Sequence, residues 1–176
     1  MNQPTAVFQS FTLGENLEHF SGEEGALRRQ AISHAINLEV STETIFKGTR
    51  TPAKDFTSPV LPGYSEDIKG NEVLEYDPEK AKKLWAEADK INKWDNPSLE
   101  IAYNSDGDHQ VWVDAVCNQI KNTLGIDSHG APQPTFKQIR SAITSKTIKT
   151  AARTGWQGDY PSMLEFLAPI FVTGAG

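Results

Sequence analysis

The residues most suited to chemistry lie together in one stretch, Thr154-Gly155-Trp156-Gln157-Gly158-Asp159-Tyr160-Pro161. Two glycines allow close approach of the backbone to another molecule, Trp156 offers a broad stacking surface and Asp159 a carboxylate that could meet a cation. The stretch follows β-branched and small residues and precedes an apolar run, which predicts a strand over 147–153, a turn and a helix over 162–171. A buried Trp beside a capping Asp in a tight turn would explain the same residues without a ligand.

The remaining patterns alternate between strands and helices. Strands are predicted at 7–12, 99–103 (half-buried) and 126–129. A helix is predicted at 22–37, and a short one that Ser41 or Thr42 caps and that contains Ile45 and Phe46. Three more helices are predicted to follow Asp77-Pro78, the turn at 104–108 and Thr135. In the helix after 104–108, Val111 is predicted to face inward. Residues 49–76 form a long loop. The sequence therefore predicts an α/β fold, a mixed sheet with packed helices, whose ligand site lies at the carboxyl ends of the strands.

Composition excludes several classes of protein. The net charge of −6 and the pI of about 5.2 leave no basic stripe for nucleic acid. Cys117 is the single cysteine and falls at an apolar position of a helix, which favours an inert core thiol. His34 and His129 have no partners at metal-ligand spacing, and no nucleophile elbow or phosphate-binding glycine loop is present, so we expect no metal, no cofactor and no enzymatic activity. Arg28 and Arg29 are interpreted as a solvated helix face.

Three strings together resemble a known family. They are 27–37 (Leu-Arg-Arg-Gln-Ala-Ile-Ser-His-Ala-Ile-Asn), 76–88 (Tyr-Asp-Pro-Glu-Lys-Ala and onward) and Gly155-Trp156 to Tyr160. In this order they resemble the family 5 extracellular solute-binding proteins of bacterial ABC transporters, the oligopeptide- and dipeptide-binding proteins. His34 and Asn37 differ from the Tyr and Asp common in the family.

The resemblance implies a substrate-binding protein that captures oligopeptides or dipeptides outside the membrane for import. It implies one lobe of a two-lobed, type II periplasmic-binding-protein fold, with residues 1–176 as the C-terminal lobe, truncated at both ends relative to the full protein. The implied partners are a peptide ligand, an ABC permease and the N-terminal lobe. The implied location is extracytoplasmic, in the periplasm or at the cell surface, with a lipid anchor on the full-length protein.

The resemblance also implies roles for five residues. Asp159 would meet the α-ammonium group of the peptide, Trp156 would wall its first side-chain pocket, and the backbone around Gln157 would pair with it as an added strand. Arg153 would lie near the peptide's carboxyl end, and His109 matches a histidine of some oligopeptide binders. A surface charge for Arg153 and a solvated helix-start histidine for His109 stay open as alternatives. So do a non-peptide solute such as a nickel complex or a sugar, a surface scaffold domain, and an enzyme of unknown type.

Overall fold

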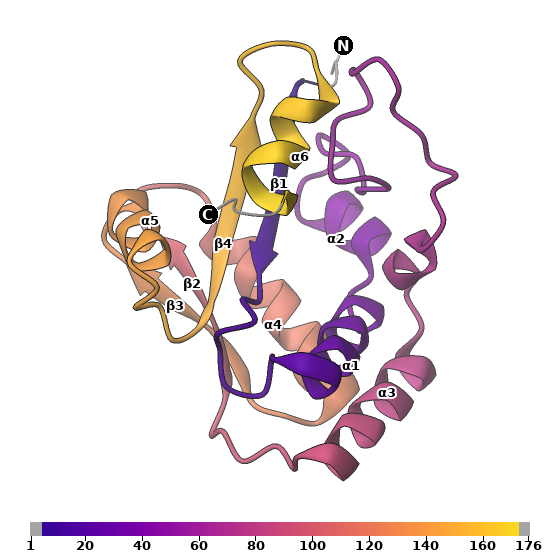
Figure 1. Ribbon diagram of the computed structural model, residues 1–176, viewed down its shortest axis with the longest axis vertical. Helices are drawn as coiled ribbons and strands as arrows, with labels where there is room; N and C mark the ends of the chain where they lie inside the picture. The colour runs from indigo at the N-terminus through magenta and orange to yellow at the C-terminus, as the bar shows by residue number, and fades with distance from the viewer. Residues whose placement is uncertain (1–4, 173–176) are drawn as a thin grey trace.

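The computed structural model describes residues 5–172, and its helices and strands alternate along the chain (Figure 1). The strands are β1 (Val7–Thr12), β2 (Leu99–Asn104), β3 (Ser128–Gln133) and β4 (Ala151–Gln157). The α-helices are α1 (Gly22–His34), α2 (Leu38–Thr44), α3 (Pro78–Ile91), α4 (Gln110–Leu124), α5 (Phe136–Thr144) and α6 (Met163–Phe171), with a short 3-10 helix, η1, at Asn71–Leu74. The predicted α/β class is confirmed.

The strands form one mixed sheet in the order β1-β4-β2-β3. Strand β2 is parallel to both β3 and β4, while β1 runs antiparallel to β4. The connections from β2 to β3 and from β3 to β4 each contain a helix, as crossovers between parallel strands of one sheet require. The pairing of β2 with β4 covers Ile101 opposite Ala151 and Ala102 opposite Ala152, and within the described residues it goes no further.

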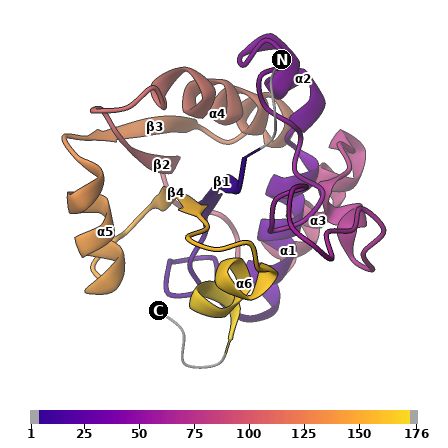
Figure 2. The ribbon, with the colours of Figure 1, turned by 90° about the horizontal axis from the view of Figure 1, so that it is seen from above.

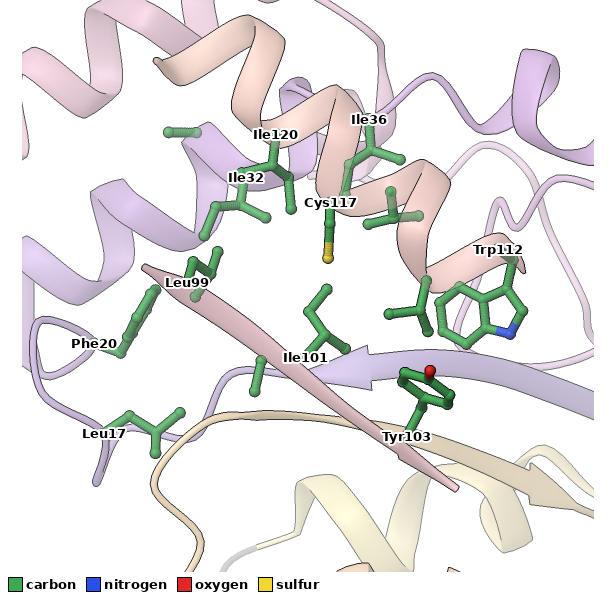
Figure 3. Packing of buried hydrophobic residues seen from close by; sticks show 14 of the residues in the cluster. Leu17, Phe20, Ile32, Ile36, Leu99, Ile101, Tyr103, Trp112, Cys117 and Ile120 are labelled. Carbon is green, nitrogen blue, oxygen red and sulfur yellow. The ribbon is translucent and has the colours of Figure 1, made fainter. Parts of the chain in front are cut away.

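Helices lie on both faces of this sheet. Figure 2 shows α1, α3 and α4 around one side and α5 on the other. Ile101 and Tyr103 of β2 point toward α4 and α1 (Figure 3). On the opposite face Ala102 is buried, and so is Ile139 of α5, which lies against β2. Strand β2 is therefore buried on both faces, and the prediction of a half-buried strand was wrong because the second helical layer was not foreseen.

The core packs α1 and α4 against β2. Its α4 members are Trp112, Val113, Val116, Cys117 and Ile120. Val111, predicted to face inward, is 68% exposed, because Trp112 and Val113 form the buried face at the start of α4. Burial raises the pKa of the Cys117 thiol to about 11, which keeps it protonated and confirms an inert core cysteine.

Arg28 is wholly buried, so the predicted solvated face of α1 was wrong at this residue. Its Nε donates to Glu24 Oε1 at 2.8 Å, and its Nη2 donates to Asp89 Oδ1 at 2.9 Å. The guanidinium carbon lies 4.4 Å from the centre of the Trp85 ring. Two carboxylates and an indole from α3 and α1 thus replace the water that an exposed arginine would have.

His19 extends the same network. Its Nδ1 lies 2.7 Å from Glu24 Oε1 and its Nε2 lies 2.8 Å from Asp95 Oδ1. Burial lowers the pKa of His19, but the hydrogen bonds to Asp95 and Glu24 outweigh it, so the net pKa is raised. The imidazole of His19, held between two carboxylates, therefore ties the segment before α1 to the segment after α3.

Helix ends follow local chemistry in some places and tertiary contacts in others. Asp77 caps α3 by accepting from Lys80 N–H, as predicted, and Gly125 ends α4 in the left-handed region. Ser21 precedes α1 without a side-chain cap bond, and the Glu24 carboxylate, three residues later, is engaged by Arg28 and His19. The second helix begins after Asn37, whose side chain accepts from Val40 N–H, and not after Ser41 or Thr42.

The loop over 49–76 holds its predicted place between α2 and α3. Among the apolar residues of this loop, Leu61 is 4% exposed, whereas Phe56 and Val60 are 53% and 45% exposed. Phe56 contacts the ring of Phe8 on β1 at a centroid distance of 5.8 Å. The loop is thus anchored at Leu61, and Phe56 lies at the surface against β1.

Candidate functional site at the end of strand β4

Strand β4 runs through most of the glycine-tryptophan stretch. The predicted strand over 147–153 was wrong in position, because β4 spans Ala151–Gln157. Trp156 lies opposite Phe8 and Gln157 opposite Val7 of β1. The strand continues because β1, some 150 residues earlier in the chain, supplies a partner for it. Trp156 and Gln157 are therefore held on a strand, and the turn begins only at Gly158.

The outer edge of β4 is open beyond Ala152. Gly158 N–H donates to Ala6 O on the β1 side at 2.9 Å. Backbone groups of alternate residues face opposite edges of a strand, so the N–H and C=O groups of Gly155 and Gln157 face away from β1. Within the described residues no strand pairs with that edge, and Figure 1 shows β4 rising past the end of β2.

Trp156 is half-buried on this strand. Its Nε1 atom is buried and has no hydrogen-bond partner within the described residues. The structure therefore differs from the alternative interpretation, in which Trp156 would be buried in the core. The ring combines apolar surface with an unused donor.

Asp159 lies in the turn between β4 and α6, with its side chain exposed. Its backbone N–H donates to both carboxylate oxygens of Glu165, at 2.9 and 2.8 Å. The Tyr160 N–H also donates to Glu165, at 2.9 Å. The turn is thus held by its backbone, and the Asp159 carboxylate is directed to solvent.

Arg153 is the first residue of β4 after the pairing with β2 ends. Its Nη1 donates to Asn104 Oδ1 at 3.4 Å, and its guanidinium carbon lies 5.1 Å from the centre of the Phe136 ring. Its Nε is buried without a partner within residues 5–172. Burial lowers the pKa of Arg153, and the charge of Arg50 lowers it further. This is a partly desolvated cation rather than a surface charge.

His109 immediately precedes α4 and is half-buried. Its Nδ1 accepts from Trp112 Nε1 at 3.2 Å. Burial lowers the pKa of His109, and the nearby Arg153 lowers it further. A neutral ring with Nδ1 as acceptor carries its proton on Nε2, so His109 offers one N–H donor beside Arg153.

The tertiary structure thus brings the predicted residues into two groups. Arg153 and His109 lie near each other at the carboxyl end of β2, and Trp156, Gln157 and Asp159 follow along β4 and just past its end. Sequence reasoning missed Asn104, although it stands at the end of a strand, where ligands of such folds bind. It also missed Glu165, although Ser162 followed by Glu three residues later is the sequence pattern of a capping box.

Two hollows lie elsewhere. One of about 180 Å³ lies between α5 and the sheet and includes Ile139. The other, of about 370 Å³, lies within the 49–76 loop and includes Glu66 and Glu72. Neither includes a predicted site residue. The open edge of β4 is exposed to solvent. A ligand bound there would be enclosed only if a second domain covered this surface.

One group has the composition of a cation site. Glu18, His19 and Asp95 place ligand atoms within 4.8 Å of one another. Both nitrogens of His19 are engaged by carboxylates, however, and Glu24, one of these, is held in turn by Arg28. The ion network explains this arrangement.

The family model for the bacterial extracellular solute-binding proteins, family 5, middle region, matches residues 25–176. This chain belongs to that family. The recognition made from the three sequence strings is confirmed. Across residues 5–172 no helix has the length and apolar character needed to cross a bilayer.

Relatives within and around the family agree with this assignment. The dipeptide-binding protein of Escherichia coli K12 is 37% identical over 81 residues, which are 43% of this chain and 14% of that protein. Heme-binding protein A of Haemophilus influenzae is 38% identical over 60 residues, 34% of this chain and 10% of that protein. The chain therefore spans well under two thirds of these relatives.

A solved structure shows the same fold. Peptide-bound OppA of Listeria monocytogenes superposes with a TM-score of 0.80 at 21% identity, over 97% of this chain and 34% of that one. The type II periplasmic-binding-protein fold predicted for the chain is confirmed by this likeness.

Proposed function

We propose that this chain is the C-terminal lobe of a substrate-binding component of an ABC transporter, which captures oligopeptides or dipeptides outside the membrane for import. It acts by binding, without catalysis. The observation that carries the proposal is the open edge of β4, which has a partly desolvated cation at its start and an exposed carboxylate just past its end. An extended peptide carries the complementary groups, a carboxylate, a hydrogen-bonding backbone and an ammonium group.

The backbone of the peptide pairs with β4. The N–H and C=O groups of Gly155 and Gln157 are available along the open edge, and main-chain pairing of this kind is independent of the peptide's side chains. A binder of peptides of many sequences requires this independence. Trp156 supplies apolar surface for the first side-chain pocket.

The ends of the peptide meet opposite charges. Asp159 binds the α-ammonium group through a charge-assisted hydrogen bond worth about 1.5–3 kcal/mol. At the other end Arg153 and the Nε2–H of His109 bind the carboxylate. Arg50, whose charge is felt by both Arg153 and His109, adds attraction for an anion there.

The rest of the transport system completes the function. An N-terminal lobe of the same polypeptide closes over the β4 edge and excludes water, and ligand binding shifts the two lobes toward the closed state. The closed protein then delivers the peptide to an ABC permease. We place the protein in the periplasm or at the cell surface, with a lipid anchor on the full-length form.

The test measures peptide affinity by calorimetry on the full-length polypeptide. Asp159→Ala is expected to weaken binding of a free-amine peptide by about tenfold or more, equivalent to about 1.4 kcal/mol. Glu79→Gln, which changes an exposed carboxylate on α3, is the matched control and is expected to leave affinity unchanged. Unchanged affinity in a folded Asp159→Ala protein would remove the amine contact.

A second candidate is a non-peptide solute, and the similarity to a heme-binding protein favours it. A thermal-shift screen with peptides, heme, a nickel complex and sugars separates the two, because a true ligand stabilises in proportion to its concentration. An amine-blocked peptide that bound as well as a free one would also favour the second candidate. A surface scaffold domain would respond to none of these ligands.

A further inference from the structure

The carboxylate of Glu165, on α6, contacts the backbone of the turn that carries the proposed amine site. Its carboxylate accepts three bonds, two from the Asp159 N–H at 2.9 and 2.8 Å and one from the Tyr160 N–H at 2.9 Å. Only 8% of the residue is exposed. A charged acceptor with two adjacent backbone donors is strong, and its partial burial strengthens it further.

These bonds differ from those of an ordinary helix cap. In a capping box the carboxylate at the third helical position reaches back to the N–H of the cap residue. Here Ser162 N–H donates instead to Tyr160 O at 2.8 Å, and Ser162 Oγ accepts from Leu164 N–H at 3.2 Å. Ser162 therefore caps α6 by itself, and Glu165 is directed to the turn two and three residues before the cap.

The next residue of α6 supports the same turn from a second side. Phe166 is 1% exposed, and a Cβ atom added to Gly158 would lie 2.8 Å from its ring. The Gly158 backbone therefore rests against the Phe166 ring while Glu165 holds the two N–H groups that follow. Two neighbouring residues of α6 thus fix the position of the turn.

We propose that Glu165 is a positioning residue that aims the Asp159 carboxylate at the ligand's ammonium group. A bond to the N–H of Asp159 itself restrains the backbone from which that side chain projects, so the carboxylate is held toward solvent before a ligand arrives. Pre-organisation of this kind removes an ordering cost from binding. The inference rests on the proposed function, since it requires Asp159 to bind an amine.

The test compares a free-amine peptide with its N-acetylated form on the full-length polypeptide, by calorimetry. Glu165→Gln keeps the size of the side chain but replaces one acceptor oxygen by an NH₂ group, so the three bonds cannot all be kept. We expect it to weaken the free-amine peptide by about fivefold and the acetylated peptide hardly at all. Ser162→Ala, which removes the α6 cap bond and leaves Glu165 intact, is the matched control and is expected to affect both peptides equally little.

A mutant cycle supplies the decisive readout. In an Asp159→Asn background Glu165→Gln should have no further effect on affinity, because there is no longer a carboxylate to aim. An equal loss for both peptides, or the same loss in the Asp159→Asn background, would make Glu165 a purely structural residue. If Asp159→Asn weakens binding and Glu165→Gln does not, only this inference fails. If the wild type binds no peptide, the proposed function fails with it.

A second variant covers the case in which Glu165→Gln does not fold. Glu165→Asp keeps the charge but withdraws the carboxylate by one methylene from the two N–H groups. The same selective loss for the free-amine peptide is expected, and wild-type affinity for both peptides would overturn the proposal.

Discussion

Replacement of Arg28 by methionine tests the buried ion network that joins α1 to α3. The change keeps an unbranched side chain of similar length and removes the guanidinium group. Glu24 Oε1 then loses its 2.8 Å partner, Asp89 Oδ1 loses its 2.9 Å partner, and the carbonyl of Asn92 loses a bond of 2.6 Å. The cation that lies over Trp85 is removed as well.

The expected cost follows from the burial of these groups. The Arg28 side chain has no exposed surface and that of Glu24 has 11%. Removal of one partner from a buried ion pair costs about 3–5 kcal/mol, because the remaining charge stays desolvated. Glu24 keeps His19 as a partner, which favours the lower end of that range.

Urea unfolding followed by circular dichroism at neutral pH measures this cost. Arg140→Met, at an exposed position of α5, is the matched control and should change the free energy of unfolding by no more than about 0.5 kcal/mol. Replacement of both Glu24 and Arg28 by apolar residues should cost less than the sum of the single changes. If Arg28→Met costs no more than Arg140→Met, the network does not hold the two helices together.

Two further predictions concern His19 and Gly158. The folded pKa of His19 is raised above the ordinary 6.5. The stabilising charge of His19 is therefore fully present below pH 6.5 and is lost as the pH rises through the folded pKa. His19→Gln should then cost more unfolding free energy at about pH 5.5 than at about pH 9. An equal cost at both pH values in urea titrations would show that His19 is not charged in the native protein. Gly158→Ala would place a Cβ atom 2.8 Å from the buried Phe166 ring and should destabilise by about 1–3 kcal/mol, with Gly158→Ala/Phe166→Leu recovering part of the loss. If the thermal midpoint of Gly158→Ala equals that of the wild type, the turn is not packed against α6 as described.

Local signals in the sequence predicted much of the fold. Asp77-Pro78 starts α3 and Gly125 ends α4, because a cap and a left-handed residue act on their own neighbours in the chain. The strand at 7–12 was predicted at its observed bounds. The family could also be recognised from the sequence, since its three strings are short and continuous.

Contacts between distant segments decided what the sequence left open. Strand β4 extends through Trp156 because β1 pairs with it, and a local pattern that contains glycine could not show this. Arg28 reads as a surface residue until α3 brings Asp89 and Trp85 to it. Each of these outcomes depends on a partner more than 50 residues away in the chain.

For the candidate site, the resemblance of the sequence to a family of peptide binders predicted five residues, Asp159, Trp156, Gln157, Arg153 and His109, whose types suit the groups of a peptide. Only the tertiary structure decided that Arg153 and His109 share one end of the sheet and that Glu165 holds the turn of Asp159. The physical reason is that charge and hydrogen-bonding capacity belong to a residue, whereas desolvation and direction come from the segments that the fold packs around it.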